Sequence, residues 1–255
     1  MNLDFEKSLT YIAKEPGWVN KLLAGSGILL ATYAVYVIPL FAFLFSDSVV
    51  IGAGSFLLCL IFSLVMTFVI AGYFVQTGNR RINFANSFLP DWIEFGRMFV
   101  TGVKYFVGFF IYCLPVAILS LLFGLALAFV FVNHNAFHPA AFILLTAFGA
   151  LLLLLYLLVM IFAPLMMANF FRNLKILSFV DFKGAFSMLK NNVGNYCVLI
   201  LLFVALSVMT NLLLSILAVT VIGIIFIPVV YFYTYIVAAE LIAQFVIVAK
   251  ENEQE

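Results

Sequence analysis

Six long apolar runs divide this sequence, and they constrain its fold more than any other feature. Each is long enough for a helix to cross the hydrocarbon core of a bilayer, which takes about 20 residues. Because of them, 67% of the residues are hydrophobic and only 9% are charged, whereas soluble domains are about half apolar and about a quarter charged. The sequence therefore predicts an all-α polytopic membrane bundle. The runs cover approximately residues 22–45, 49–75, 105–132, 140–171, 196–220 and 224–249.

The positions of the basic residues predict how these six spans are oriented. Every lysine and arginine falls on one side of the six-span arrangement, and the other side keeps only Asp47, His134 and His138 as titratable groups. Cytoplasmic loops are enriched in Lys and Arg, so both termini are expected to be cytoplasmic. The basic residues are Lys7, Lys14, Lys21, Arg80, Arg81, Arg97, Lys104, Arg172, Lys175, Lys183, Lys190 and Lys250.

Three short segments before the odd-numbered spans are predicted to be amphipathic helices lying at the cytoplasmic interface, at 5–14, 92–101 and 181–190. In the first and third, apolar residues recur at i, i+4 and i+7, which places them on one helical face. Asp91, between Pro90 and the second segment, is interpreted as its N-cap. The apolar residues of the two faces are Phe5, Leu9 and Ile12, and Phe182, Phe186 and Leu189.

The same segments suggest a threefold repeat within a single transmembrane domain, residues 1–255. Phe5, Trp92 and Phe182 are separated by 87 and 90 residues, and each unit would hold one interfacial helix and two spans. The alternative is that any helix entering a membrane from the cytoplasm has this pattern. The repeat units would be 1–80, 88–172 and 178–250.

Charge and cysteine content argue against several functions. A net charge of +1 does not suggest a nucleic-acid partner. The three cysteines lie in separate apolar runs, without a Cys-x-x-Cys pair. His134 and His138 have helical spacing, but zinc normally takes three or four ligands, so they are interpreted as loop residues. We therefore predict no metal site and no cofactor.

One carboxylate, Glu240, lies within a span. A charge at the centre of a span costs on the order of 2.5–3.5 kcal/mol on insertion scales, so Glu240 should face protein. Tyr233 and Gln244 share its helical stripe, and Ser207 and Asn211 form a similar stripe on span five. These five residues are the candidate polar site, between spans five and six. The site either binds a proton or cation, or joins the helices through hydrogen bonds of a neutral Glu240.

Three stretches, which follow one another in the expected order along the chain, carry a family resemblance. They are Tyr11-x-x-x-x-x-Gly17-Trp18-Val19-x-Lys21-Leu22-Leu23-x-Gly25; Leu89-Pro90-Asp91-Trp92 with Phe95-x-x-x-Phe99-x-x-Gly102; and Asp181-Phe182-x-x-x-Phe186-x-x-Leu189-x-x-Asn192-x-x-x-Tyr196 with Pro228-x-x-Tyr231-x-Tyr233-x-Tyr235-x-x-Ala238-x-x-x-x-x-Gln244. With them the chain resembles the prokaryotic membrane family catalogued as domain of unknown function 4013. The resemblance implies a multi-pass protein of a prokaryotic plasma membrane and adds no catalytic residue. Related sequences often carry a histidine in the last helix, where this chain has Glu240.

Function is predicted by elimination. An intramembrane enzyme needs paired carboxylates, a Ser/His dyad or a metal cluster, and the sequence shows none of these patterns. We therefore expect a non-enzymatic scaffold, interaction or accessory protein. Its partners would be the lipid bilayer and either other membrane proteins or further copies of itself. The alternative is a small transporter or channel that uses the polar site between spans five and six.

Overall fold

The computed structural model describes residues 3–45, 48–84, 89–132 and 139–252, and regular structure there is exclusively helical. Six of the helices are long and apolar enough to cross a membrane, which confirms the all-α polytopic fold. The elements are α1 (Phe5–Thr10), η1 (Ile12–Lys14), α2 (Trp18–Ala34), α3 (Val37–Phe45), α4 (Val49–Asn83), η2 (Trp92–Glu94), α5 (Phe95–Val132), α6 (Pro139–Asn173), η4 (Ile176–Phe179), α7 (Phe182–Lys190), α8 (Val193–Ala218) and α9 (Val221–Asn252).

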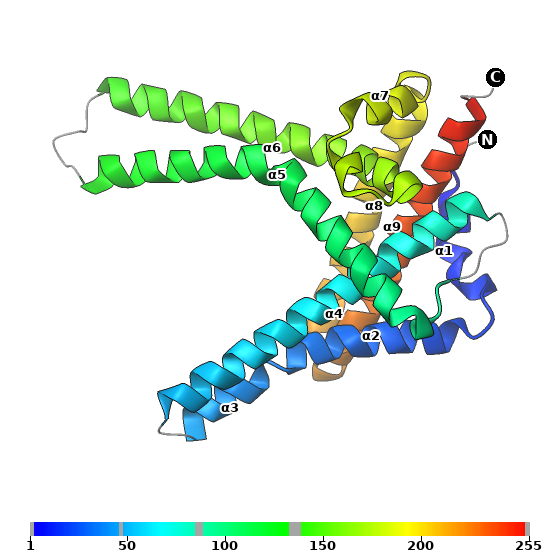
Figure 1. Ribbon diagram of the computed structural model, residues 1–255, viewed down its shortest axis with the longest axis horizontal. Helices are drawn as coiled ribbons and strands as arrows, with labels where there is room; N and C mark the ends of the chain where they lie inside the picture. The colour runs from blue at the N-terminus through cyan, green and yellow to red at the C-terminus, as the bar shows by residue number, and fades with distance from the viewer. Residues whose placement is uncertain (1–2, 46–47, 85–88, 133–138, 253–255) are drawn as a thin grey trace.

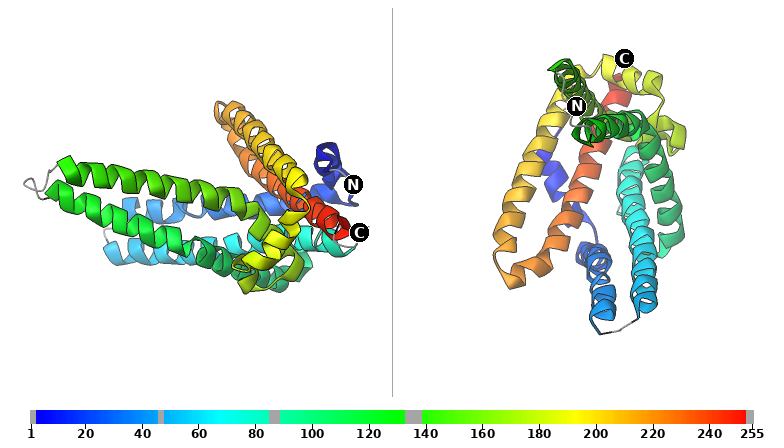
Figure 2. Two further views of the ribbon diagram at one scale, coloured as in Figure 1. Left: turned by 90° about the horizontal axis from the view of Figure 1, so that it is seen from above. Right: turned by 90° about the vertical axis from the view of Figure 1, so that its left-hand side faces the viewer.

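The long helices form three hairpins that diverge from one common region (Figures 1 and 2). They pair α2 and α3 with α4, α5 with α6, and α8 with α9. The second helices of the hairpins, α4, α6 and α9, contact one another where the hairpins meet. We call this contact region the hub, residues 69–82, 165–171 and 236–249, because most buried apolar residues of these helices lie there. Both chain termini lie at the hub end of the molecule (Figure 1).

Away from the hub the hairpins are sparsely packed. Between residues 142 and 164 of α6 Leu152 alone is buried inside the protein, and in the most apolar stretch of α5 only 6% of the residues are. Long apolar side chains such as Leu121, Leu153 and Met160 are therefore exposed at the protein surface. In a bilayer these faces meet hydrocarbon or other membrane helices, since exposed apolar area of this extent would not be stable in water.

Prolines lie inside three of the spanning helices, at Pro115 in α5, Pro164 in α6 and Pro228 in α9. A proline removes one backbone hydrogen bond and displaces the preceding turn, so it bends a helix without ending it when packing holds both halves. Helix α5 bends along its length (Figure 1). Its first half packs against α4 and its second half follows α6.

Two of the three predicted amphipathic segments are separate short helices. Asp4 caps α1 by accepting a hydrogen bond from the Lys7 backbone N–H at 2.9 Å, and Asp181 caps α7 in the same way through Gly184 at 3.0 Å. Both short helices lie at an angle to the long helices that follow them (Figure 1). Gly17, with a φ of +70°, makes the turn between η1 and α2, a conformation that glycine adopts without strain.

The prediction of a separate helix at 92–101 is wrong. The turn η2 continues directly into α5, because Phe95 already has right-handed helical backbone angles. Packing against α4 explains the continuity. Met98 is fully buried there, and the backbones of α4 and α5 cross closely at Gly72 and Gly102. The segment is thus the start of a spanning helix. Whether residues 1–80, 88–172 and 178–250 are true repeats stays a prediction.

Candidate functional site

The carboxylate of Glu240 lies in the hub and is completely buried. It faces α4, where the Nε of Arg81 donates a hydrogen bond to Glu240 Oε1 at 3.0 Å. This contact forms because α4 continues past 75, the predicted end of its span, as far as Asn83. One turn further along α9, the side-chain amide of Gln244 donates to the same carboxylate oxygen at 3.3 Å.

The N-terminal segment packs against the same stripe of α9. The Gln244 amide nitrogen donates to the Ser8 hydroxyl at 2.9 Å, and its oxygen accepts from the Asp4 backbone N–H at 2.9 Å. Tyr233 donates its hydroxyl hydrogen to the backbone oxygen of Leu9 at 2.7 Å. The predicted stripe of Tyr233, Glu240 and Gln244 therefore faces the interior of the protein, against α1 and α4.

Arg81 gives Glu240 a charged partner that the sequence did not reveal. An arginine side chain that is only 12% exposed sits beside a carboxylate that is not exposed at all. Glu240 Oε2 has no hydrogen-bond partner within the described ranges. Removing one member of such a buried pair is costly, because the remaining charge stays desolvated. The arrangement thus makes the Arg81–Glu240 pair a fixed connection between α4 and α9.

Ser207 and Asn211 do not join this site. Both are exposed on α8, and the Asn211 amide donates to the Ser207 backbone oxygen at 2.8 Å within its own helix. Thr210 of α8 does hydrogen-bond across to α9, since its hydroxyl lies 3.1 Å from that of Thr234. The candidate residues therefore form two groups, and a polar site between spans five and six is not assembled from them.

A second charged cluster joins the residues around the start of α2 to the segment between α4 and α5. The Lys21 ammonium lies 2.7 Å from both Glu15 Oε1 and Asp91 Oδ1, and it donates to the Leu89 backbone oxygen at 2.8 Å. The other Glu15 oxygen accepts from the Leu89 N–H at 3.0 Å. Asp91 precedes η2 but makes no side-chain capping bond. Its carboxylate pairs with Lys21 instead, and this hydrogen bond lowers the pKa of Asp91.

Aromatic packing extends the same cluster into the hub. The Trp92 indole donates to the Lys21 backbone oxygen at 3.2 Å. Its ring stacks on Tyr73 of α4 with centroids 4.6 Å apart, and Phe232 of α9 packs against both rings. Trp92 of η2, which continues into α5, therefore contacts α2, α4 and α9. These contacts fix the four long helices relative to one another.

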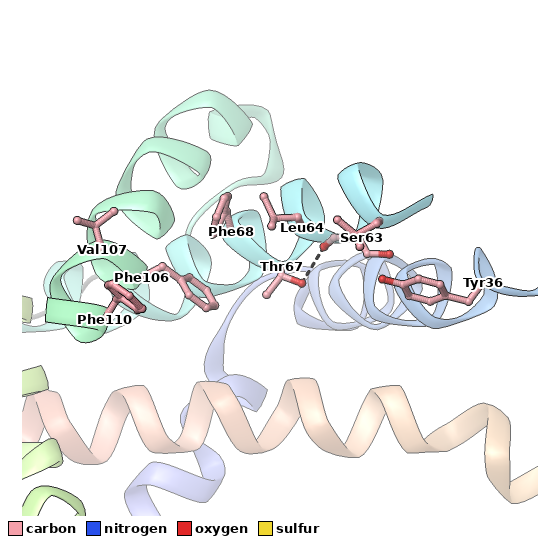
Figure 3. A pocket seen from close by; sticks show the side chains of 9 residues that line it. Tyr36, Ser63, Leu64, Thr67, Phe68, Phe106, Val107 and Phe110 are labelled. Atoms are coloured by element: carbon pink, nitrogen blue, oxygen red, sulfur yellow. Dashed lines mark hydrogen bonds between the residues drawn. The ribbon is translucent and has the colours of Figure 1, made fainter. Parts of the chain in front are cut away.

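A lateral cavity of about 500 Å³ opens between α4, α5 and the junction of α2 and α3 (Figure 3). Two of its polar side chains are already hydrogen-bonded within the protein. Ser63 donates to the Thr32 backbone oxygen at 3.2 Å, and Thr67 donates to the Ser63 backbone oxygen at 2.7 Å. The wall is otherwise apolar and aromatic, so the cavity suits hydrocarbon. It is lined by Tyr36, Leu60, Ser63, Leu64, Thr67, Phe68, Phe106, Val107 and Phe110.

The comparisons with known proteins identify the family. The model of the family described as protein of unknown function (DUF4013) matches residues 55–219, more than half of the chain. The chain belongs to the DUF4013 family. No curated protein and no solved structure matches it. The DUF4013 match includes Arg81 and Asp91, whereas their partners Glu240 and Lys21 lie outside it.

Few reactive side chains lie close together in the described part of this DUF4013 protein. Among the residues described, no three His, Cys, Asp or Glu side chains gather as metal ligands would. His134 and His138 lie outside the described residues, so their interpretation stays a prediction. The buried carboxylate of Glu240 is held by an arginine and an amide. Such an arrangement joins helices and orients side chains.

Proposed function

We propose that this DUF4013 protein is a non-enzymatic membrane scaffold. The hub holds three hairpins apart, and their outer parts present apolar faces to lipid and to helices of other membrane proteins or further copies of the chain. We place it in a prokaryotic plasma membrane. The observation that carries the proposal is the sparse packing of the spans, since Leu152 alone is buried between residues 142 and 164 of α6.

The hub supports this proposal because its polar groups are used to connect helices. The Arg81–Glu240 pair joins α4 to α9, Gln244 joins α9 to α1, and Lys21 joins α2 to Asp91 before η2. Small-residue packing and interhelical hydrogen bonds are what associate helices in lipid, where the hydrophobic effect between helices is absent. A rigid hub and exposed hairpins are the two properties that a scaffold requires.

Site-specific photo-crosslinking in cells tests the proposal. A photoreactive amino acid at Leu153, which is 62% exposed on α6, is expected to give discrete adducts that mass spectrometry identifies as protein. Leu152 is a matched control, because it is the neighbouring position and only 9% exposed. Lipid adducts alone at Leu153 would contradict a scaffold. Proton uptake by purified protein in liposomes that is lost in Glu240→Gln would favour the transporter instead.

We also infer that both termini and the hub face the cytoplasm, because all basic residues lie on one side of the six spans. In a variant without native cysteines, a cysteine at position 47 or 135 is expected to react with an impermeant thiol reagent applied to intact cells. A cysteine at Lys175 is expected to react only after the cells are opened. Labelling at 175 in intact cells would invert the proposed orientation. The native cysteines to be replaced are Cys59, Cys113 and Cys197.

A further inference from the structure

A polar cavity of about 710 Å³ lies at the hub end of the molecule, among the last turns of α6 and α9 and the helix α7. It is separate from the Glu240 site and from the lateral apolar cavity, and the family membership assigns nothing to it. Its lining consists of polar and charged residues and one glycine. They are Asn169, Arg172, Asn173, Asp181, Gly184, Ser187, Lys190, Asn191 and Asn252.

The charged groups of this lining favour an anion. Arg172 and Lys190 contribute two positive charges, and Asp181 contributes one negative charge. The Asp181 carboxylate is already engaged, because it accepts the Gly184 N–H at the start of α7. The Lys190 ammonium makes no hydrogen bond or ion pair with the part of the chain that the structure describes. This ammonium and the side-chain amide of Asn191 are therefore donors that a ligand could use.

The surroundings of this cavity have the pattern of a helix at a membrane interface. Phe182 and Phe186 of α7 are 49% and 45% exposed, and Leu177 of the preceding turn is 71% exposed. Apolar side chains exposed beside lysines are typical of a helix that lies in the membrane interface, with its apolar face toward the acyl chains and its basic residues at the headgroups. Lys183 and Lys190 are the lysines of α7.

We propose that this cavity binds an anionic phosphate group, contacted by Lys190, Arg172 and Asn191. Lysine binds phosphate as a point charge, and Arg172 adds a second positive charge to the lining. The same chemistry is offered by the headgroup of an anionic phospholipid and by a free phosphate or phosphate ester. The proposal does not depend on whether the hairpins bind partner proteins.

Charge-matched variants of one helix test the proposal. Lys190→Gln and Lys183→Gln each remove one exposed lysine from α7, but only Lys190 lines the cavity. Native mass spectrometry of the purified protein would count bound phosphatidylglycerol, with phosphatidylcholine as the zwitterionic control. Lys190→Gln is expected to weaken phosphatidylglycerol retention by about three- to fivefold, as fits an exposed ion pair. Lys183→Gln should retain it like the unmodified protein.

A second measurement distinguishes the two sources of phosphate. Inorganic phosphate is added at constant ionic strength, and the thermal unfolding midpoint of each variant is compared with a chloride control. Stabilisation by phosphate that only Lys190→Gln abolishes, without a preference for phosphatidylglycerol, would assign the cavity to a free phosphate. Equal behaviour of Lys190→Gln and Lys183→Gln in both measurements would overturn the proposal, since the effect would then be general surface charge.

Discussion

Replacing Arg81 by leucine is expected to lower the free energy of unfolding by about 3–5 kcal/mol, the range observed when one partner of a buried ion pair is removed. Glu240 would remain fully buried and lose its charged partner at 3.0 Å. The lower stability would appear as a reduced thermal unfolding midpoint of the purified protein in detergent. The hub would also loosen, because the pair connects α4 to α9.

Arg80 provides a matched control for this variant. It is the neighbouring residue of the same helix, but it pairs with Glu94 at a more exposed position. Exposed pairs contribute up to about 1 kcal/mol, so Arg80→Leu should have a much smaller effect. The double variant Arg81→Leu/Glu240→Leu should recover most of the stability, because it leaves no unpaired buried charge. Equal unfolding midpoints for Arg81→Leu and Arg80→Leu would show that the buried pair has no special role.

Glycine 102 is the position where the smallest substitution should have a large effect. A Cβ atom on Gly102 would lie 1.7 Å from the Phe68 backbone oxygen, and one on Gly72 would lie 1.7 Å from the Met98 backbone oxygen. Backbone atoms cannot move aside as a side chain can, so α4 and α5 would have to separate. Gly102→Ala is therefore expected to destabilise the protein by about 3 kcal/mol, at the upper end of overpacking effects.

Gly96 is the control for this prediction, because it lies in the same helix and a Cβ there meets nothing within 4 Å. Gly96→Ala should leave the stability unchanged or raise it by up to about 1 kcal/mol, as alanine is the better helix former. The thermal unfolding midpoints of both variants, measured side by side, decide the question. A Gly102→Ala protein as stable as Gly96→Ala would mean that the two helices are not in close contact at this crossing.

Hydropathy and the positions of charge were sufficient to predict the six spans. The same kind of reasoning correctly placed Glu240 toward protein, because an unpaired charge facing lipid is unfavourable. It could not identify Arg81 as the partner. Gln76 and the polar residues after it end the apolar run, but they do not end the helix, which continues to Asn83. The length of a span in hydrocarbon and the length of its helix are different quantities.

The candidate polar residues show a second limit. Ser207 and Asn211 have the same helical spacing as residues of the α9 stripe, yet they are exposed and bond within α8. A short polar side chain in a helix can satisfy its hydrogen bonds with the preceding turn, so its presence does not indicate which face is packed. Thr210 bonds to α9 because of how α8 and α9 are rotated about their axes. A single sequence does not reveal this rotation.

The pairing of α1 with α9 determines the order in which the molecule can assemble. Asp4 bonds to Gln244 across 240 positions of sequence, so α1 docks on a helix that is synthesised long after it. Until α9 enters the membrane, α1 and the Arg81 end of α4 lack their final partners. The hub therefore closes only after α9 has been synthesised, although the other two hairpins precede it in the chain.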